Sequence, residues 1–266
     1  HYIQPNTAID KEASERGCSV YLANKVIPML PEKIANEICS LRPKEDKLCF
    51  SIVFNIDING NVLSNWIGKT VINSKKRFTY GDAQETLNIK EGEFYNELFT
   101  LDCISKKLRA ERIKNGSEII EKKEIKIAFE NDKPIKPYYK EPLSTNKLVE
   151  EFMLLANKYV CEYYNKKFIG IYRIHDYPDM EKLEYVKKFL TTMEITFNYN
   201  NKNLASKINT LLTKVKSENC KYIINQLVLN SMSKAEYSTK NIGHFGLGFE
   251  KYSHFTSPIR RYPDLL

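Results

Sequence analysis

The sequence predicts a mixed fold of helices and strands, of the α/β (α+β) class, and three observations lead to this prediction. Two segments show apolar residues alternating with polar ones, which is typical of strands with one buried face. Five others show apolar residues every three or four positions, as in amphipathic helices. The 266 residues are 42% hydrophobic and 28% charged, which suits a globular protein with a sizeable core. No repeat and no Pro- or Gly-rich linker divides the chain, so one domain over residues 1–266 is the simpler prediction.

The clearest strands lie within residues 48–72. Their apolar residues alternate up to Asn59-Gly60, a pair that favours a tight hairpin turn, and the pattern then continues in a second strand. Residues 125–129 alternate in the same way and end at Asn131-Asp132. The alternating residues of the first strand are Phe50, Ile52, Phe54, Ile56 and Ile58.

The predicted helices begin and end at recognisable signals. Asn115-Gly116 ends the first of them, and the side chains of Ser144-Thr145-Asn146 can cap the second. Pro178 is expected in the first turn of the third, where its missing N–H costs nothing. Residues 198–203 are polar and predict a loop. The helices are expected over residues 94–108, 148–159, 179–190, 204–215 and 223–228.

The net charge and the cysteine content indicate which kind of partner and which cellular compartment to expect. A net charge of +8 and a pI of about 9.0 suit a polyanionic partner, although a lysine-rich chain without such a partner has the same composition. The longest apolar run, residues 152–156, is too short to span a membrane, and no leader opens the chain. The six cysteines form no Cys-x-x-Cys pair, which favours reduced thiols in the cytoplasm over zinc or disulfides.

Other candidate motifs are weak. The glycines of residues 243–248 lack the order of a dinucleotide-binding loop, so tight turning beside a packed backbone is favoured. No serine lies in a G-x-S-x-G elbow. The four histidines include no i, i+4 pair, which leaves a three-histidine metal site open but unsupported. They are His1, His175, His244 and His254.

Residues 254–264 contain many hydrogen-bond donors and two prolines, Pro258 and Pro263. Proline restrains the backbone, which suits groups that must be held in place. Arg260 and Arg261 are adjacent and are expected to point in different directions, so at most one faces a given site. A guanidinium donates in a planar fork that matches phosphate oxygens. From these residues alone, a solvated arginine pair is the favoured interpretation over a phosphate site.

Six sequence blocks, taken together and in order, resemble the catalytic (RNB) domain of the ribonuclease II family, and its ribonuclease R branch most. The resemblance implies a curved sheet or barrel wrapped by helices. It also implies processive 3′→5′ hydrolysis of single-stranded RNA to nucleoside 5′-monophosphates with a divalent metal, for which Mg²⁺ is expected. The blocks are RGCSVYL (16–22), PMLPEKIANEICSLRP (28–43), RFTYGDAQE (77–85), LVEEFMLLAN (148–157), YRIHDYPDMEKLE (172–184) and HFTSPIRRYPDLL (254–266).

The resemblance assigns roles to four residues, and Arg261 is a further candidate. Arg260 matches the catalytic arginine, whose charge stabilises the phosphate oxygens as the bond breaks. Tyr21 matches a tyrosine that stacks on a base near the 3′ end. Tyr80 and Glu150 match positions near the terminal ribose, whose 2′-hydroxyl distinguishes RNA from DNA. Arg261 is assigned to RNA binding. The alternatives are a core position for Tyr21 and, for Glu150, favourable placement in the positive first turn of its helix.

The metal ligands of the family are not found in this sequence. The resemblance implies an aspartate cluster of the D-x-x-x-A-K-D-x-D-D-A type upstream of residue 1 and a glutamate downstream of residue 266. The chain is therefore expected to be a domain cut at both ends that lacks the metal ligands and is inactive alone. It is expected to bind single-stranded RNA as a monomer and not to bind a membrane. Two alternatives are an inactive RNA-binding remnant and an unrelated basic domain with chance matches.

Overall fold

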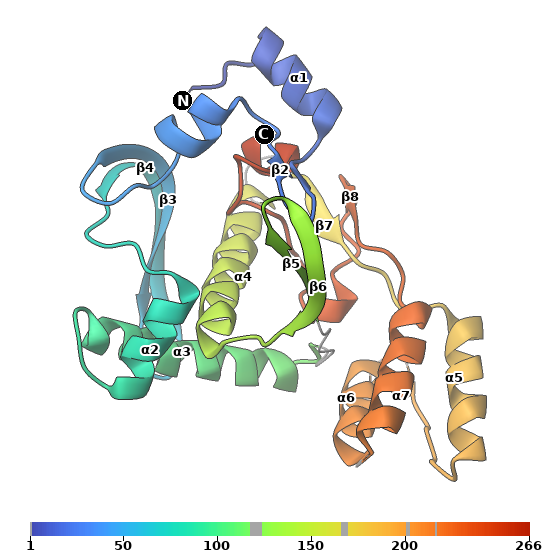
Figure 1. Cartoon of the computed structure of the whole chain (residues 1–266). Coiled ribbons are helices and arrows are strands. Elements are labelled where there is room, and N and C mark those ends of the chain that lie inside the picture. The colour runs from blue at the N-terminus through green and yellow to red at the C-terminus, as the bar shows by residue number, and fades with distance from the viewer. Residues whose placement is uncertain (1, 118–123, 166–169, 201–202, 216) are drawn as a thin grey trace. The chain divides into compact units, whose positions relative to one another are not determined.

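The computed structural model describes residues 2–117, 124–165, 170–200, 203–215 and 217–266. The chain forms two compact units, coloured along the chain in Figure 1. The first unit holds His1–Lys107, Lys123–Val160 and His254–Leu266, and the second holds Leu108–Lys122 and Cys161–Ser253. Each unit is built from segments that are distant in sequence, and one domain over residues 1–266 stays a prediction.

The first unit contains most of the strands. Its elements are α1 (Ala8–Arg16), β1 (Val20–Tyr21), β2 (Val26–Ile27), the π-helix η1 (Lys33–Ile38), β3 (Asp46–Ile56), β4 (Val62–Asn73), α2 (Tyr80–Ile89), most of α3 (Tyr95–Lys114), β5 (Glu124–Glu130), β6 (Lys133–Lys140), most of α4 (Ser144–Asn165) and α8 (Tyr262–Leu265).

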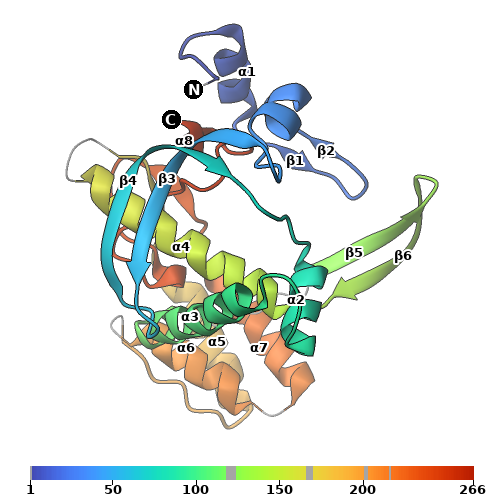
Figure 2. The same cartoon turned by 90° about the vertical axis from the view of Figure 1, so that its left-hand side faces the viewer.

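The hairpin predicted within residues 48–72 is confirmed: β3 pairs antiparallel with β4. Its turn differs in detail from the expectation, because only Gly60 has a positive φ (88°). The Asp57 carboxylate makes the turn by accepting from the backbone N–H groups of Asn59 and Asn61, each at 2.8 Å. One face of the hairpin packs on α4, where the Phe54 and Tyr159 rings lie 5.2 Å apart edge to face (Figure 2).

The second hairpin joins β5 to β6 through Asn131 and Asp132, which both have positive φ (49° and 61°). The strand predicted over residues 125–129 is confirmed, but β6 was not predicted. Its prolines, Pro134 and Pro137, argue against a strand in the middle of a sheet because proline donates no ladder hydrogen bond. In a two-stranded sheet each strand is an edge, so both prolines are tolerated.

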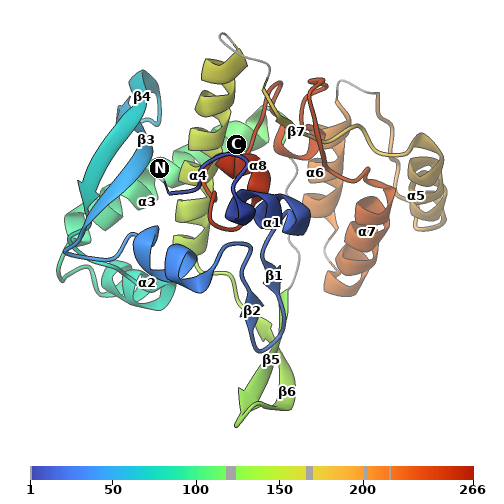
Figure 3. The ribbon, with the colours of Figure 1, turned by 90° about the horizontal axis from the view of Figure 1, so that it is seen from above.

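The second unit is mostly helical. It contains β7 (Tyr172–Ile174) paired with β8 (Glu236–Ser238), the 3-10 helix η2 (Phe245–Leu247) and the helices α5 (Met180–Thr192), α6 (Leu204–Lys214) and α7 (Glu218–Ser231). Figures 1 and 3 show α5 and α6 on either side of α7. All three helices were predicted. Their shared core includes Leu183, Val186, Leu190, Ile208, Leu212, Ile224 and Val228.

Two local expectations for the second unit can be compared with the structure. Helix α5 begins at Met180 and Asp179 caps it: the Asp179 carboxylate accepts from the N–H groups of Glu181 and Lys182, so Pro178 lies outside the helix and not in its first turn. The glycine segment 243–248 turns tightly beside packed backbone, as predicted. Gly248 has a φ of 66°, and a Cβ there would lie 2.8 Å from the Ser117 nitrogen.

The mixed class of helices and strands is confirmed, whereas the curved sheet or barrel is not. Among the described residues the named strands form four separate two-stranded antiparallel sheets. Three of these are local hairpins, and no described strand pairs with a third strand that would extend or close a sheet. Within the same part of the chain, no helix is long and apolar enough to cross a membrane.

Candidate nucleic-acid interface

Backbone hydrogen bonds join the segment before Tyr21 to the segment around Arg260. The Ser19 nitrogen donates to the Arg260 carbonyl oxygen at 3.0 Å, and the Tyr262 nitrogen donates to the Gly17 oxygen at 2.9 Å. Cys18 and Arg261 form an antiparallel bridge between these contacts. Two predicted site residues from opposite ends of the sequence are thereby brought into one region of the first unit.

The two adjacent arginines point in different directions, as the sequence predicted. Arg261 donates from Nη2 to the Asp264 Oδ2 atom at 2.7 Å, and the side chains of the pair are 21% and 0% exposed respectively. Arg260 is exposed, and no hydrogen bond or ion pair of its side chain occurs within the described part of the chain. Arg260 is therefore the arginine whose charge is available to a ligand.

The loop that carries Arg260 is fixed by a buried carboxylate. Asp264 Oδ2 also accepts from the Ser257 nitrogen at 2.9 Å, and the Arg260 nitrogen donates to the Ser257 carbonyl oxygen at 3.2 Å. Asp264 thus bonds to both ends of the short segment that contains Arg260. Charge-assisted hydrogen bonds of this kind are stronger than neutral ones, so the loop is held rather than free.

Helix α4 holds the start of the same C-terminal block. The buried side chain of Asn157 accepts from the backbone nitrogens of Phe255 (2.9 Å) and Thr256 (3.2 Å). The Phe255 ring also meets Phe50 of β3, with centroids 6.1 Å apart. Asn157 was not predicted as a site residue. An amide at the end of the apolar run 152–156 was the signal that could have indicated a buried polar contact.

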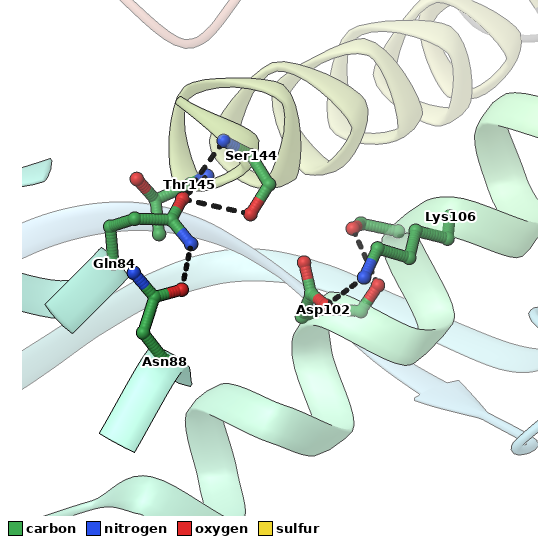
Figure 4. A network of polar contacts seen from close by, with 7 residues as sticks. Gln84, Asn88, Asp102, Lys106, Ser144 and Thr145 are labelled. Atoms are coloured by element: carbon green, nitrogen blue, oxygen red, sulfur yellow. Dashed lines mark hydrogen bonds and ion pairs between the residues drawn. The ribbon is translucent and has the colours of Figure 1, made fainter. Parts of the chain in front are cut away.

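Tyr80 and Glu150 come from α2 and α4, and side-chain bonds join the starts of these helices. Tyr80 is the first residue of α2, where Thr79 and Asp82 form a capping box. The Thr145 hydroxyl of α4 donates to the Tyr80 carbonyl oxygen at 2.9 Å. Gln84 of α2 reaches the first turn of α4 as well, as Figure 4 shows. Gln84 was not singled out from the sequence, and Thr145 was expected only to cap its own helix.

Glu150 is exposed, whereas its neighbour Glu151 is buried. The alternative explanation for Glu150, placement in the positive first turn of its helix, is wrong. Helix α4 begins at Ser144 and its first turn holds no acidic residue, so Glu150 lies in the second turn. The dipole of the helix acts mainly within the first turn. An exposed carboxylate remains that a ligand hydroxyl could reach.

Tyr21 is 60% exposed on the short strand β1, where it pairs with Val26 of β2. A core tyrosine has most of its ring buried, so the core alternative for Tyr21 is wrong. An exposed ring can offer its face to a base.

We expect Tyr21→Ala to weaken binding of single-stranded RNA by roughly 1–3 kcal/mol, the usual contribution of one stacked base. Removing an exposed side chain should change the free energy of unfolding by no more than about 0.5 kcal/mol. Fluorescence anisotropy with a labelled short RNA measures the first quantity and urea unfolding the second. Tyr21→Phe keeps the ring and should bind as the unsubstituted chain does. Equal weakening by both substitutions would argue against stacking.

The second unit contains a histidine pair that the sequence did not predict. The His175 and His244 rings lie 5.0 Å apart. His175 Nδ1 accepts from the Gly246 nitrogen at 3.0 Å, and its Nε2 lies 2.8 Å from the Ser233 carbonyl oxygen, which only an N–H can satisfy. Burial, followed by the nearby His175, lowers the pKa of His244 to about 4. The two rings therefore connect loops of the second unit.

The described residues do not offer a metal site. Nowhere in residues 2–117, 124–165, 170–200, 203–215 and 217–266 do three or more His, Cys, Asp or Glu side chains gather into a group that could hold a metal ion. A hard divalent cation requires several oxygen ligands at one point. The residues present do not fit the divalent metal that the resemblance implies.

Comparison with known proteins agrees with the sequence blocks. Ribonuclease R of Thermotoga maritima is 39% identical over 274 residues, and ribonuclease R of Mycoplasmopsis pulmonis is 40% identical over 279. These alignments cover 100% of this chain but only 39% and 37% of the relatives, so the chain spans less than half of their length.

Solved structures agree as well. The apo form of Mycoplasma genitalium RNase R superposes with a TM-score of 0.93 at 32% identity, covering 100% of this chain and 43% of that one. The same values are found for that protein in complex with ribose methylated single-stranded RNA. The family described as the RNB domain matches residues 1–266. The predicted resemblance is confirmed, and the chain belongs to the RNB domain family.

Proposed function

We propose that this chain forms part of a 3′→5′ exoribonuclease that degrades single-stranded RNA processively to nucleoside 5′-monophosphates. The observation that carries the proposal is the backbone junction between residues 17–19 and 260–262, which brings the exposed Tyr21 and Arg260 into one region. An exposed aromatic ring and an available guanidinium in one region suit a nucleic-acid strand, because one binds bases and the other binds phosphate. The names of the relatives support the same activity.

Each of the five candidate residues has one part in this proposal. Tyr21 stacks on a base near the 3′ end, and Arg260 donates to the phosphate oxygens as negative charge develops on them. Glu150 accepts from the 2′-hydroxyl of the terminal ribose, and Tyr80 contacts the same sugar. Arg261 contributes to RNA binding mainly through its bond to Asp264, which holds the Arg260 loop.

The proposed reaction would use a divalent metal, for which Mg²⁺ is the expected ion and which would supply the attacking hydroxide. Among the described residues no group of side chains could hold such an ion, and we propose that its ligands come from residues outside this chain. A monomeric state and a cytoplasmic location complete the proposal. The six cysteines are free thiols, which suits a reducing compartment.

The test compares this chain with a chimera in which residues 1–266 replace the matching segment of the Thermotoga maritima relative. Both are incubated with Mg²⁺ and a single-stranded RNA labelled at its 5′ end or in its 3′-terminal nucleotide. We expect the chimera to release nucleoside 5′-monophosphates from the 3′ end. The chain alone should bind the RNA without releasing them.

Sustained release by the isolated chain would contradict the assignment of the metal ligands to residues outside it. A chimera that binds RNA but never cleaves it, although the parent relative does, would favour the alternative of an inactive RNA-binding remnant. A chimera that releases internal fragments would contradict an exonuclease.

A further inference from the structure

Gln84 connects two helices that carry proposed RNA contacts. From α2, its side-chain oxygen Oε1 accepts from the Ser144 nitrogen and the Ser144 hydroxyl, each at 2.9 Å, and from the Thr145 nitrogen at 3.4 Å. Its Nε2 donates to Asn88 Oδ1 one turn further along α2 at 3.1 Å. Figure 4 shows the Gln84 amide between Asn88 and the first residues of α4.

This contact fills the place of a helix cap. The first N–H groups of a helix have no partner within the helix and are usually bonded by the side chain of the residue before it. Leu143 precedes α4 and has no acceptor in its side chain. Gln84, which lies 60 residues earlier in the sequence, supplies the acceptor instead. Capping of α4 is therefore coupled to the position of α2.

A second bond acts at the same junction. The buried Thr145 hydroxyl donates to the carbonyl oxygen of Tyr80, one turn before Gln84 on α2. The two bonds fix the first turn of α2, which carries Tyr80, against the first turn of α4, and Glu150 lies one turn further along α4. The separation between Tyr80 and Glu150 thus depends on how Gln84 and Thr145 hold the helices.

We propose that Gln84 is a positioning residue for recognition of the terminal ribose. It touches no RNA itself, and by joining α2 to α4 it holds Tyr80 and Glu150 at the separation that one ribose requires. It thereby contributes to the discrimination of RNA from DNA, since that discrimination depends on bonds to the 2′-hydroxyl. This inference rests on the proposed function, in which Tyr80 and Glu150 contact that sugar.

The test measures binding of the 266-residue chain to two oligonucleotides that differ only in the last sugar, ribose or 2′-deoxyribose. We expect Gln84→Met, which keeps the length of the side chain without the acceptor, to lower the ratio of the two affinities roughly three- to tenfold, the effect of losing one hydrogen bond. Gln84→Glu retains the acceptor, and its negative charge suits a helix N-terminus, so the ratio should be preserved.

A matched control separates positioning from stability. Asp179→Ala removes the cap of α5, a helix of the second unit that carries none of the proposed contacts, and should lower stability by a similar amount. Its affinity ratio should equal that of the unsubstituted chain. All variants are measured well below the temperature at which the least stable one unfolds.

Each outcome of this experiment supports or overturns the role proposed for Gln84. An unchanged ratio in Gln84→Met overturns the role of Gln84 while leaving the proposed function intact. A lower ratio in both Gln84→Met and Asp179→Ala also overturns it, because loss of stability then accounts for the effect. If the unsubstituted chain does not distinguish the two sugars, the assignment of Tyr80 and Glu150 fails and the inference fails with it.

Discussion

Replacing Arg260 with Ala should lower the rate of RNA cleavage by about two orders of magnitude or more, the usual effect of losing one charge contact to a transition state. The structure supports this choice, because Arg260 is exposed whereas the guanidinium of Arg261 is bonded to the buried Asp264. RNA binding should weaken far less, since the remaining phosphate contacts of a long strand are kept. Single-turnover cleavage by the chimera measures the rate of the chemical step.

Two variants make the measurement specific to Arg260. Arg42 is exposed and outside the proposed interface, so Arg42→Ala removes the same charge and should change the rate by less than about twofold. Arg260→Lys keeps a positive charge without the planar fork and should recover only part of the activity. An equal loss in Arg42→Ala would mean that net charge, and not a contact at the scissile phosphate, accounts for the effect.

Elements with strong periodic patterns could be predicted from the sequence. The β3–β4 hairpin and helices α3 to α7 each carry apolar residues at regular spacing over several turns or strand positions, and this spacing can be recognised in the sequence. Helices α1 and α2 were missed because each buries little, with Ala13 and Ala83 as their buried residues. A short helix that buries one small side chain leaves almost no periodic signal.

The candidate site could be predicted only in part, for a different physical reason. The sequence blocks identified the exposed residues Tyr21, Tyr80 and Glu150, whose roles stay predictions. They did not identify Gln84 or Asn157, whose side chains bond to backbone atoms of segments about 60 and 98 residues away. Such contacts depend on tertiary structure, because any polar side chain at the right place can make them. No local pattern encodes them.

The division into two units was also beyond the reach of local patterns. The helices α3 and α4 both continue across the division, at residues 107–108 and 160–161, so no break in periodicity marks it. The residues on either side of these two positions are helical. A linker rich in Pro or Gly is the usual sign of a boundary, and the sequence has no such linker.

Asp264→Ala should lower the free energy of unfolding of the first unit by about 3 kcal/mol, the lower end of the range for a broken buried ion pair. The Asp264 side chain is 0% exposed and holds both the Arg261 guanidinium and the Ser257 nitrogen. Its loss leaves Arg261 without its partner, while the 21% exposure of Arg261 lets water reduce the penalty. The released loop carries Arg260, so cleavage by the chimera should fall as well.

Trp66, the only tryptophan of the sequence, lies on β4 in the first unit, so its fluorescence in increasing urea reports the unfolding of the unit that contains Asp264. Asp264→Asn keeps an acceptor for Ser257 but not the negative charge, and should lie between Asp264→Ala and the unsubstituted chain. The Arg261→Ala, Asp264→Ala double substitution should be less destabilising than the sum of the two single ones, because it leaves no unpaired charge. Additive losses would show that the pair contributes nothing as a pair, and the explanation for the fixed Arg260 loop would then be wrong.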